Sequence, residues 1–121
     1  MRAYLALSIE EVRDFYAKKS FNPEIVYAPT IKFITENPEL DEEEAEYEIS
    51  MIAAHNSGGY VIALEIPEKQ ITQHFEESVE LNSNIIWENV EALFVYDSVD
   101  DELTWYATQE ISDFLSTAGA K

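Results

Sequence analysis

Tyr60-Val61-Ile62-Ala63-Leu64-Glu65-Ile66-Pro67 is the stretch of this sequence that decides the fold. Between Tyr60 and Pro67 every residue except Glu65 is aliphatic, and the proline stops the run. Runs of this kind, with few polar interruptions, are typical of strands that are buried on both faces. The sequence therefore predicts a strand in the middle of a sheet, with the rest of the chain packed around it.

An acidic helix is predicted immediately before this strand. Asp41 is placed as its N-cap with Glu44 at the third helical position, and acids crowd the first turn, where the helix dipole favours negative charge. The helical pattern continues to about Asn56, and Ser57-Gly58-Gly59 ends it. A helix, a tight reversal and the central strand are thus expected in succession.

The remaining segments alternate strands with helices. Ser8 and Glu11 form an S-x-x-E capping box that opens a helix over 9–19, and a brief helix is expected after Thr30. The segment 67–76 fits either a loop or one or two helical turns. Further strands are predicted at 2–7, 25–28, 79–81, 85–87, 90–97 and 104–108, and a short terminal helix around 111–115. This order predicts an α+β fold, with a mixed or mostly antiparallel sheet and two or three packed helices.

The length and composition predict one domain. A chain of 121 residues with 46% hydrophobic residues is large enough to build one core. We expect residues 1–115 to form a single α+β domain and the small-residue segment 116–121 to be a flexible C-terminal tail.

The charge of the chain excludes several classes of partner. There are 25 Asp and Glu residues against 7 Lys and Arg, a formal net charge of -18. Such a surface repels nucleic acid phosphates and anionic lipid, so we expect neither nucleic acid nor membrane as a partner. The chain has no cysteine and no apolar run near the roughly 20 residues of a membrane helix, which favours a cytoplasmic protein.

Neither a metal site nor a cofactor site is predicted. His55 and His74 lack the spacing of a zinc motif, and the acids of 41–44 lack the alternating oxygens and the glycine of a calcium loop. Gly58-Gly59 lacks the third glycine and the Lys-Ser of a phosphate-binding loop. The histidines are expected at the surface or at helix ends, and the acids in a helix start.

Three motifs of the sequence are distinctive: the opening Met1-Arg2-Ala3-Tyr4-Leu5, the acidic helix Asp41-Glu42-Glu43-Glu44-Ala45-Glu46-Tyr47 and the closing Trp105-Tyr106-Ala107-Thr108-Gln109-Glu110. Together they resemble an uncharacterised family of small actinobacterial proteins, a domain of unknown function. The resemblance spans nearly the whole chain, but it implies no activity. The sequence departs from the family pattern in being shorter between Tyr96 and Leu103, and in having Gly58-Gly59 where basic residues are usual.

The closing motif is the candidate binding element. Side chains alternate between the two faces of a strand, so Trp105 and Ala107 are expected on one face and Tyr106 and Thr108 on the other. Trp105 has the larger apolar area and is predicted to face the core. That leaves Tyr106, Thr108, Gln109 and Glu110 as candidate binding residues near solvent.

An enzymatic alternative comes from a remoter similarity to ADP-ribosyltransferase folds. In that family an early Arg or His, a mid-chain Ser or Thr and a late Glu bind NAD, and the Glu stabilises the developing ribosyl cation. The resemblance implies Arg2, Thr30 and Glu110 as catalytic candidates. The glutamate motif of the family is absent here, since Gln109 adjoins Glu110. An ion pair of Arg2 with one of the many acids is the simpler explanation of that arginine.

A second apolar stripe on the acidic helix leaves a partner surface open. Tyr47 and Met51 lie nearly opposite the stripe that faces the sheet. Either another part of the chain covers them, or they contact a protein partner or a second copy. We therefore expect a small, acidic, non-catalytic interaction or regulatory module. The alternatives are the NAD-binding domain and a DNA mimic, in which carboxylates imitate phosphates.

Overall fold

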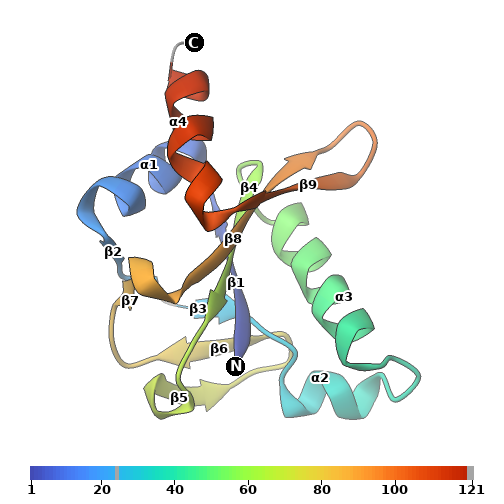
Figure 1. Ribbon diagram of the computed structural model, residues 1–121. Helices are drawn as coiled ribbons and strands as arrows, with labels where there is room; N and C mark the ends of the chain where they lie inside the picture. Colours follow the sequence, from blue (N-terminus) through green and yellow to red (C-terminus); the bar gives the residue numbers. More distant parts are fainter. Residues whose placement is uncertain (24, 120–121) are drawn as a thin grey trace.

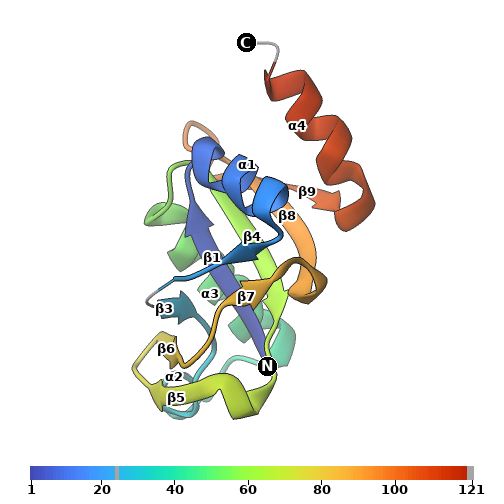
Figure 2. The same cartoon turned by 90° about the vertical axis from the view of Figure 1, so that its left-hand side faces the viewer.

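The structure is a computed structural model that describes residues 1–23 and 25–119. A seven-stranded sheet forms its centre, with helices on both faces (Figures 1 and 2). The strand order is β5-β6-β3-β1-β4-β8-β9, and each of the strand pairs described is antiparallel. The expected α+β class and the mostly antiparallel sheet are confirmed. The strands are β1 (Arg2–Leu7), β2 (Ser20–Phe21), β3 (Ile25–Tyr27), β4 (Tyr60–Glu65), β5 (Ile71–His74), β6 (Ser78–Leu81), β7 (Ile85–Ile86), β8 (Val90–Asp97) and β9 (Glu102–Ala107).

The predicted central strand is β4, which lies between β1 and β8. It pairs with β1 along its whole length, from Arg2 opposite Glu65 to Leu7 opposite Tyr60. Four consecutive residues of β4, from Val61 to Leu64, are buried, alternately against one face and the other. The unbroken apolar run in β4 therefore correctly indicates a strand that is covered on both faces.

One face of the sheet is covered by α1 (Ile9–Lys18) and α4 (Ile111–Gly119). The capping box of α1 is present, since the Ser8 hydroxyl accepts from the Glu11 amide at 3.2 Å and the Glu11 carboxylate accepts from the Ser8 amide at 2.9 Å. Phe15 of α1 is fully buried, and its ring packs edge-on against Trp87 at 5.0 Å. Trp87 begins a short 3₁₀ turn between β7 and β8.

The opposite face is covered by α2 (Ile31–Glu36) and α3 (Glu42–His55). The predicted cap of α3 is confirmed, because the Asp41 carboxylate accepts from the Glu44 amide at 2.8 Å and Glu44 accepts from the Asp41 amide at 3.0 Å. Ile49 is fully buried against the sheet. Figure 2 shows α1 in front of β1 and β4 and α3 behind them.

The reversal between α3 and β4 depends on its glycines. The Gly58 amide donates to the Leu7 carbonyl at 3.0 Å, and a Cβ at Gly58 would lie 3.0 Å from the Cα of Ser8. Gly59 has φ +105°, a conformation that L side chains rarely adopt. Gly58 and Gly59 thus end the helix as predicted, and Gly58 also allows the chain to pass close to Leu7 and Ser8.

Two strands, β2 and β5, were not predicted from the sequence. The ambiguous segment 67–76 contains a 3₁₀ turn (Glu68–Gln70) followed by β5, which pairs with β6 at the sheet edge. β2 follows α1 directly and pairs with β7 in a separate two-stranded sheet. Two-residue strands carry too little periodicity to be read from sequence.

The C-terminal helix is longer than expected. α4 continues to Gly119, so the segment 116–119, assigned to the tail, is helical. Residues 120 and 121 of that expected tail lie outside the described residues.

Contrary to the prediction from the sequence, Trp105 does not face the core. The alternation of side chains holds, but Trp105 is 57% exposed, whereas Tyr106 packs against Phe114 with ring centroids 4.9 Å apart. The face that receives Trp105 lies at the sheet margin, where β9 has β8 as its one strand neighbour.

Candidate functional site

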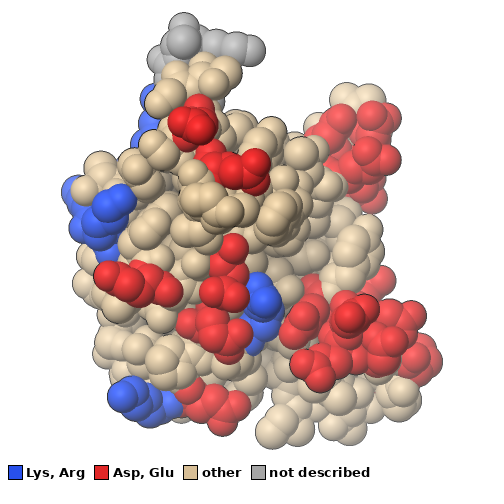
Figure 3. Space-filling view, viewed as in Figure 1, with Lys and Arg blue, Asp and Glu red and all other residues tan. Residues whose placement is uncertain are grey.

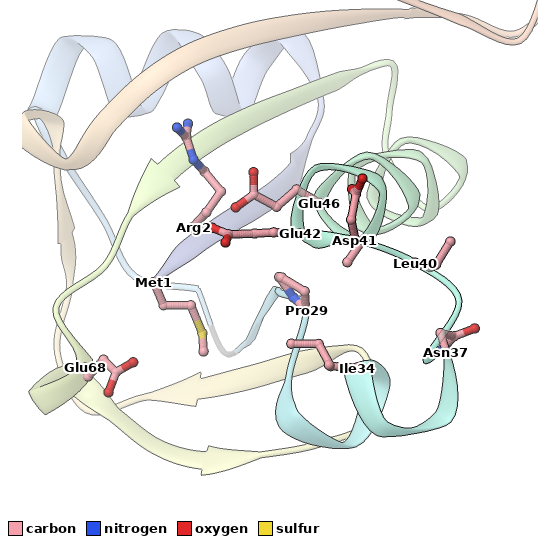
Figure 4. A pocket seen from close by; sticks show the side chains of 11 residues that line it. Met1, Arg2, Pro29, Ile34, Asn37, Leu40, Asp41, Glu42, Glu46 and Glu68 are labelled. Atoms are coloured by element: carbon pink, nitrogen blue, oxygen red, sulfur yellow. The ribbon is translucent and has the colours of Figure 1, made fainter.

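A pocket of about 350 Å³ lies where the start of β1 meets α2 and α3. Its apolar wall comes from segments far apart in sequence, including Met1, Pro29, Ile34, Leu40 and Ala45. The pocket is at the lower end of the size range of small-molecule sites and is large enough for one long side chain. Figure 4 shows Pro29 and Ile34 on one side of the pocket and the start of α3 on the other.

Carboxylates surround this apolar wall. Asp41, Glu42, Glu46 and Glu68 line the pocket, and Arg2 is the one base among the described residues that line it. The side chains of Glu42 and Glu46 extend from α3 toward the side where Arg2 lies (Figure 4). Arg2 is held from the other direction by a long ion pair with Glu91, at 3.9 Å. The pocket thus combines apolar contact area with an excess of negative charge.

Two groups beside the pocket have altered acidity. Burial raises the pKa of Glu46 above its usual value, and the neighbouring Glu42 adds to the effect while Arg2 opposes it. Burial, together with the charge of Glu46, raises the pKa of Tyr4 to about 12. The Tyr4 phenol is therefore neutral at neutral pH, and ionisation of the Glu46 carboxyl group costs folding stability.

The cost of the Glu46 charge predicts a pH-dependent effect of Glu46→Gln. A carboxyl whose folded pKa is raised contributes stability when protonated, and this contribution is lost as pH rises from the ordinary value of 4.5 through the raised one. At neutral pH Glu46→Gln is therefore expected to raise the melting temperature, and below the ordinary pKa the gain should vanish. Thermal unfolding followed by circular dichroism at both pH values measures it, with Glu10→Gln as the exposed control. A lower melting temperature at neutral pH would contradict the burial argument.

Two further acidic hollows adjoin the pocket. One is lined by Glu43, Glu44 and Tyr47, the other by Glu36, Glu39 and Ile52, and both share Leu40 with the pocket and Glu48 with each other. Exposed apolar side chains lie beside these acids: Ile34, 52% exposed, lines the pocket and Tyr47, 58% exposed, lines one of the hollows. Figure 3 shows Asp and Glu side chains gathered over the start of α3, and a second group over the β8–β9 tip. We call the continuous region formed by α2, α3 and the link between them the acidic corner.

The three catalytic candidates do not share this pocket. Arg2 lines it, whereas Thr30 and Glu110 are not among its described lining residues. Thr30 is fully buried and caps α2: its hydroxyl accepts from the Phe33 amide at 3.2 Å and donates to the Glu76 carbonyl at 2.7 Å. The Glu110 carboxylate accepts from the Ala107 amide at 2.8 Å. Both side chains have structural partners within the chain, and neither is among the described residues that line the pocket beside Arg2.

The candidate binding residues of the closing motif also make contacts within the chain. Tyr106 is half-buried against α4, and the Thr108 hydroxyl donates to the Val90 and Glu91 carbonyls at 3.2 and 3.0 Å. Gln109 and Glu110 are exposed in a 3₁₀ turn (Thr108–Glu110). None of the four lines the pocket described above, and their role in binding stays a prediction.

The second stripe of α3 divides between core and surface. Met51 is 8% exposed within the single chain, so a partner cannot reach most of it, whereas Tyr47 lies open in the acidic corner. Of these two residues, Tyr47 alone is available to a partner.

A polar cluster at the far end of α3 was not anticipated from the sequence. Asp101 accepts from the Tyr96 hydroxyl at 2.6 Å and lies 2.8 Å from His55 Nε2. These hydrogen bonds, from Tyr96 first and then His55, hold the pKa of Asp101 below its usual value. The cluster fastens the β8–β9 hairpin to the end of α3. His55 and Asp101 are 46 residues apart, so no spacing in the sequence predicts their contact.

The described residues show neither a metal-ligand cluster nor a membrane-spanning helix. They contain no group of three or more His, Cys, Asp or Glu side chains arranged to hold a metal ion. Within the same part of the chain, no helix has both the length and the apolar character needed to cross a membrane.

The comparisons with known proteins give a family and no activity. A family model described as a family of unknown function, DUF6912, matches residues 1–101. No curated protein and no solved structure matches the chain. The matched range includes the pocket and the whole acidic corner and ends before Trp105, so the closing motif lies outside it.

Proposed function

The chain belongs to the DUF6912 family of unknown function, and we propose that it is a cytoplasmic, non-catalytic interaction module that binds a basic segment of a partner protein. The acidic corner is the proposed binding surface. The observation that supports the proposal is the apolar pocket bordered by four carboxylates and adjoined by two further acidic hollows.

A lysine or arginine side chain matches the pocket in both shape and charge. Its aliphatic stem would contact Pro29, Ile34 and Leu40, while its charged end would reach the carboxylates of Glu42 and Glu46. The raised pKa of Glu46 supports this assignment, because a cation next to that carboxylate would relieve the cost of its charge. Retention of a destabilising charge is common at functional sites, where activity is favoured over stability.

The adjoining hollows favour a peptide over a small amine. The pocket alone would suit a single ammonium group, but the neighbouring hollows place further acids and the exposed Tyr47 along the same surface. An extended or helical segment with several bases and apolar residues would contact all of them at once. Opposite charge would also accelerate its association.

A titration with a defined probe tests the proposal. The probe is a short peptide in which lysine and leucine alternate, added to the ¹⁵N-labelled protein at physiological ionic strength and followed by NMR. We expect saturable shifts at the amides of Leu40, Ala45 and Tyr47. The double variant Glu42→Gln/Glu46→Gln should weaken binding by about tenfold, the loss typical of a contact at the centre of an interface.

The control removes the same charge elsewhere. Glu10 and Glu88 are exposed on the α1 side of the sheet, and neither has an ion pair among the described residues. Glu10→Gln/Glu88→Gln should leave the affinity within about twofold of the original, because screening confines exposed charges to short range. Equal losses in the two double variants would show that total charge, as in a DNA mimic, governs binding, and would overturn the proposal.

A further inference from the structure

The last strand of the sheet, β9, has an open edge. It is the terminal strand in the order, and its extensive contacts are with β8 alone. The helix that follows, α4, packs on the face of the sheet through Ile111 and Leu115 instead of along the outer side of β9. An open strand edge presents unpaired backbone groups with which another strand can pair.

The pairing of β8 identifies which backbone groups of β9 point outward. The Tyr96 amide donates to the Gly59 carbonyl at 2.9 Å, so the backbone of Tyr96 and of every second residue before it faces β4. Val95 and Leu93 therefore face β9, where their partners are Thr104 and Tyr106. The amides and carbonyls of the intervening β9 residues must point away from the sheet.

Leu103 and Trp105 are the intervening residues whose outward groups are free. No other described residue bonds to their amides or carbonyls outside the strand ladder. The next outward amide, that of Ala107, is already bonded to the Glu110 carboxylate at 2.8 Å, which closes the edge at this end. Two residues spaced as alternate members of a strand thus offer two donors and two acceptors to an added strand.

An exposed aromatic side chain accompanies these backbone groups. Trp105 is 57% exposed and lies opposite Phe94 on the face of the sheet that α3 covers farther in. Leu103 is half-buried on the same face. A strand added at this edge would place alternate side chains beside the indole of Trp105, and tryptophan is among the residues that most often dominate interface energies.

The charges at the two ends of β9 select the occupant. Asp100 and Glu102 lie at the hairpin end and Glu110 follows the other end, all exposed, and there is no Lys or Arg from Gln70 to Ala120. In an antiparallel pair of β9 strands, the hairpin end of one copy, with Asp100 and Glu102, would lie beside Glu110 of the other copy. The two chains would also repel each other as a whole, because each carries a charge of -18. A second copy is therefore disfavoured, and a strand with bases at its ends is favoured.

We propose that the open edge of β9 pairs with an extended segment of a partner protein that has apolar residues at its centre and Lys or Arg at both ends. The partner strand bonds to the backbone of Leu103 and Trp105 and packs against the Trp105 ring. This β-addition surface shares no residue with the pocket of the acidic corner and does not depend on the function proposed there.

The experiment uses a peptide of the sequence Lys-Lys-Val-Thr-Val-Thr-Lys-Lys and hydrogen exchange measured by NMR on the whole protein. The amides of Leu103 and Trp105 should exchange rapidly in the free protein and slow by at least about tenfold at saturation. The peptide with Glu in place of Lys should give no such slowing. If the two peptides slow exchange equally, charge does not select the partner and the proposal is overturned.

Two substitutions at one position separate the backbone from the side chain. Trp105→Thr removes the indole and keeps the amide, and should weaken binding by about tenfold. Trp105→Pro removes the indole and the outward amide together, which an edge strand tolerates, and should abolish binding. Protected amides at Thr104 and Tyr106 would confirm that β9 stays paired with β8 in both variants.

Two results would overturn the proposal. Equal affinities of Trp105→Thr and Trp105→Pro would show that the peptide does not pair with the backbone edge. Self-association of the unmodified protein that Trp105→Pro abolishes, measured by sedimentation, would make a second copy the occupant. Neither result affects the loss of binding expected for Glu42→Gln/Glu46→Gln at the acidic corner. The two binding proposals are therefore tested independently.

Discussion

Phe15→Ala is expected to lower the free energy of unfolding by about 3–5 kcal/mol, the usual cost of removing a buried aromatic ring. Phe15 is fully buried, and its ring lies 5.0 Å from that of Trp87 and 5.7 Å from that of Phe21. It therefore joins α1 to the small β2–β7 sheet and to the turn before β8. Removing it leaves a cavity where these three elements meet, and denaturant unfolding followed by circular dichroism measures the loss.

The control is Trp105, the large aromatic residue that the sequence alone favoured for the core. Trp105 is 57% exposed, so Trp105→Ala should change the free energy of unfolding by about 0.5 kcal/mol or less, as at most surface positions. Similar losses in the two variants would contradict the structure at β9, because Trp105 would then have to be buried.

Ile49→Ala is expected to cost about 2–5 kcal/mol, since it removes the fully buried residue at the centre of the α3 contact with the sheet. Its neighbours in this contact, Ala45 and Ala53, are small and cannot fill the space. Tyr47→Ala on the exposed side of α3 is the matched control, expected to cost about 0.5 kcal/mol. Denaturant unfolding of both variants gives the comparison.

The Ile49 variant also tests whether the acidic corner depends on the seating of α3. Glu42 and Glu46 are carried by α3, while Pro29 and Ile34 come from the segment beside it. Ile49→Ala should weaken binding of the lysine–leucine peptide even where the variant is fully folded, because α3 can shift relative to Pro29. A loss of stability below about 1 kcal/mol would mean that α3 is held mainly by its ends.

The sequence predicted those elements that depend on residues only a few positions apart. Both capping boxes form as expected, at Ser8 and at Asp41, because a cap needs residues only three positions apart. The buried strand 60–65 and the fold class followed from an apolar run and from the order of elements. Membership of a family of unknown function was also anticipated, and its matched range covers 1–101.

The pocket could not be predicted in this way. Arg2, Pro29, Glu46 and Glu68 are separated along the chain by 17 or more residues, and their meeting depends on how α2 and α3 pack on β1. Arg2 was considered as a catalytic candidate, but Thr30 and Glu110, assigned with it, serve as caps. A match to the residue spacing of another family does not show which side chains meet in the folded chain.

Trp105 shows where the two kinds of information divide. The sequence by itself determined that Trp105 and Tyr106 point to opposite faces, since alternation is a property of the strand backbone. Which face is covered was decided by the tertiary structure: α4 reaches Tyr106 through Phe114, whereas Trp105 lies opposite Phe94 on an edge strand and remains largely open to solvent. Burial depends on what packs against a face, and that is set by contacts between segments distant in the chain, whereas periodicity and capping depend on neighbours a few residues away.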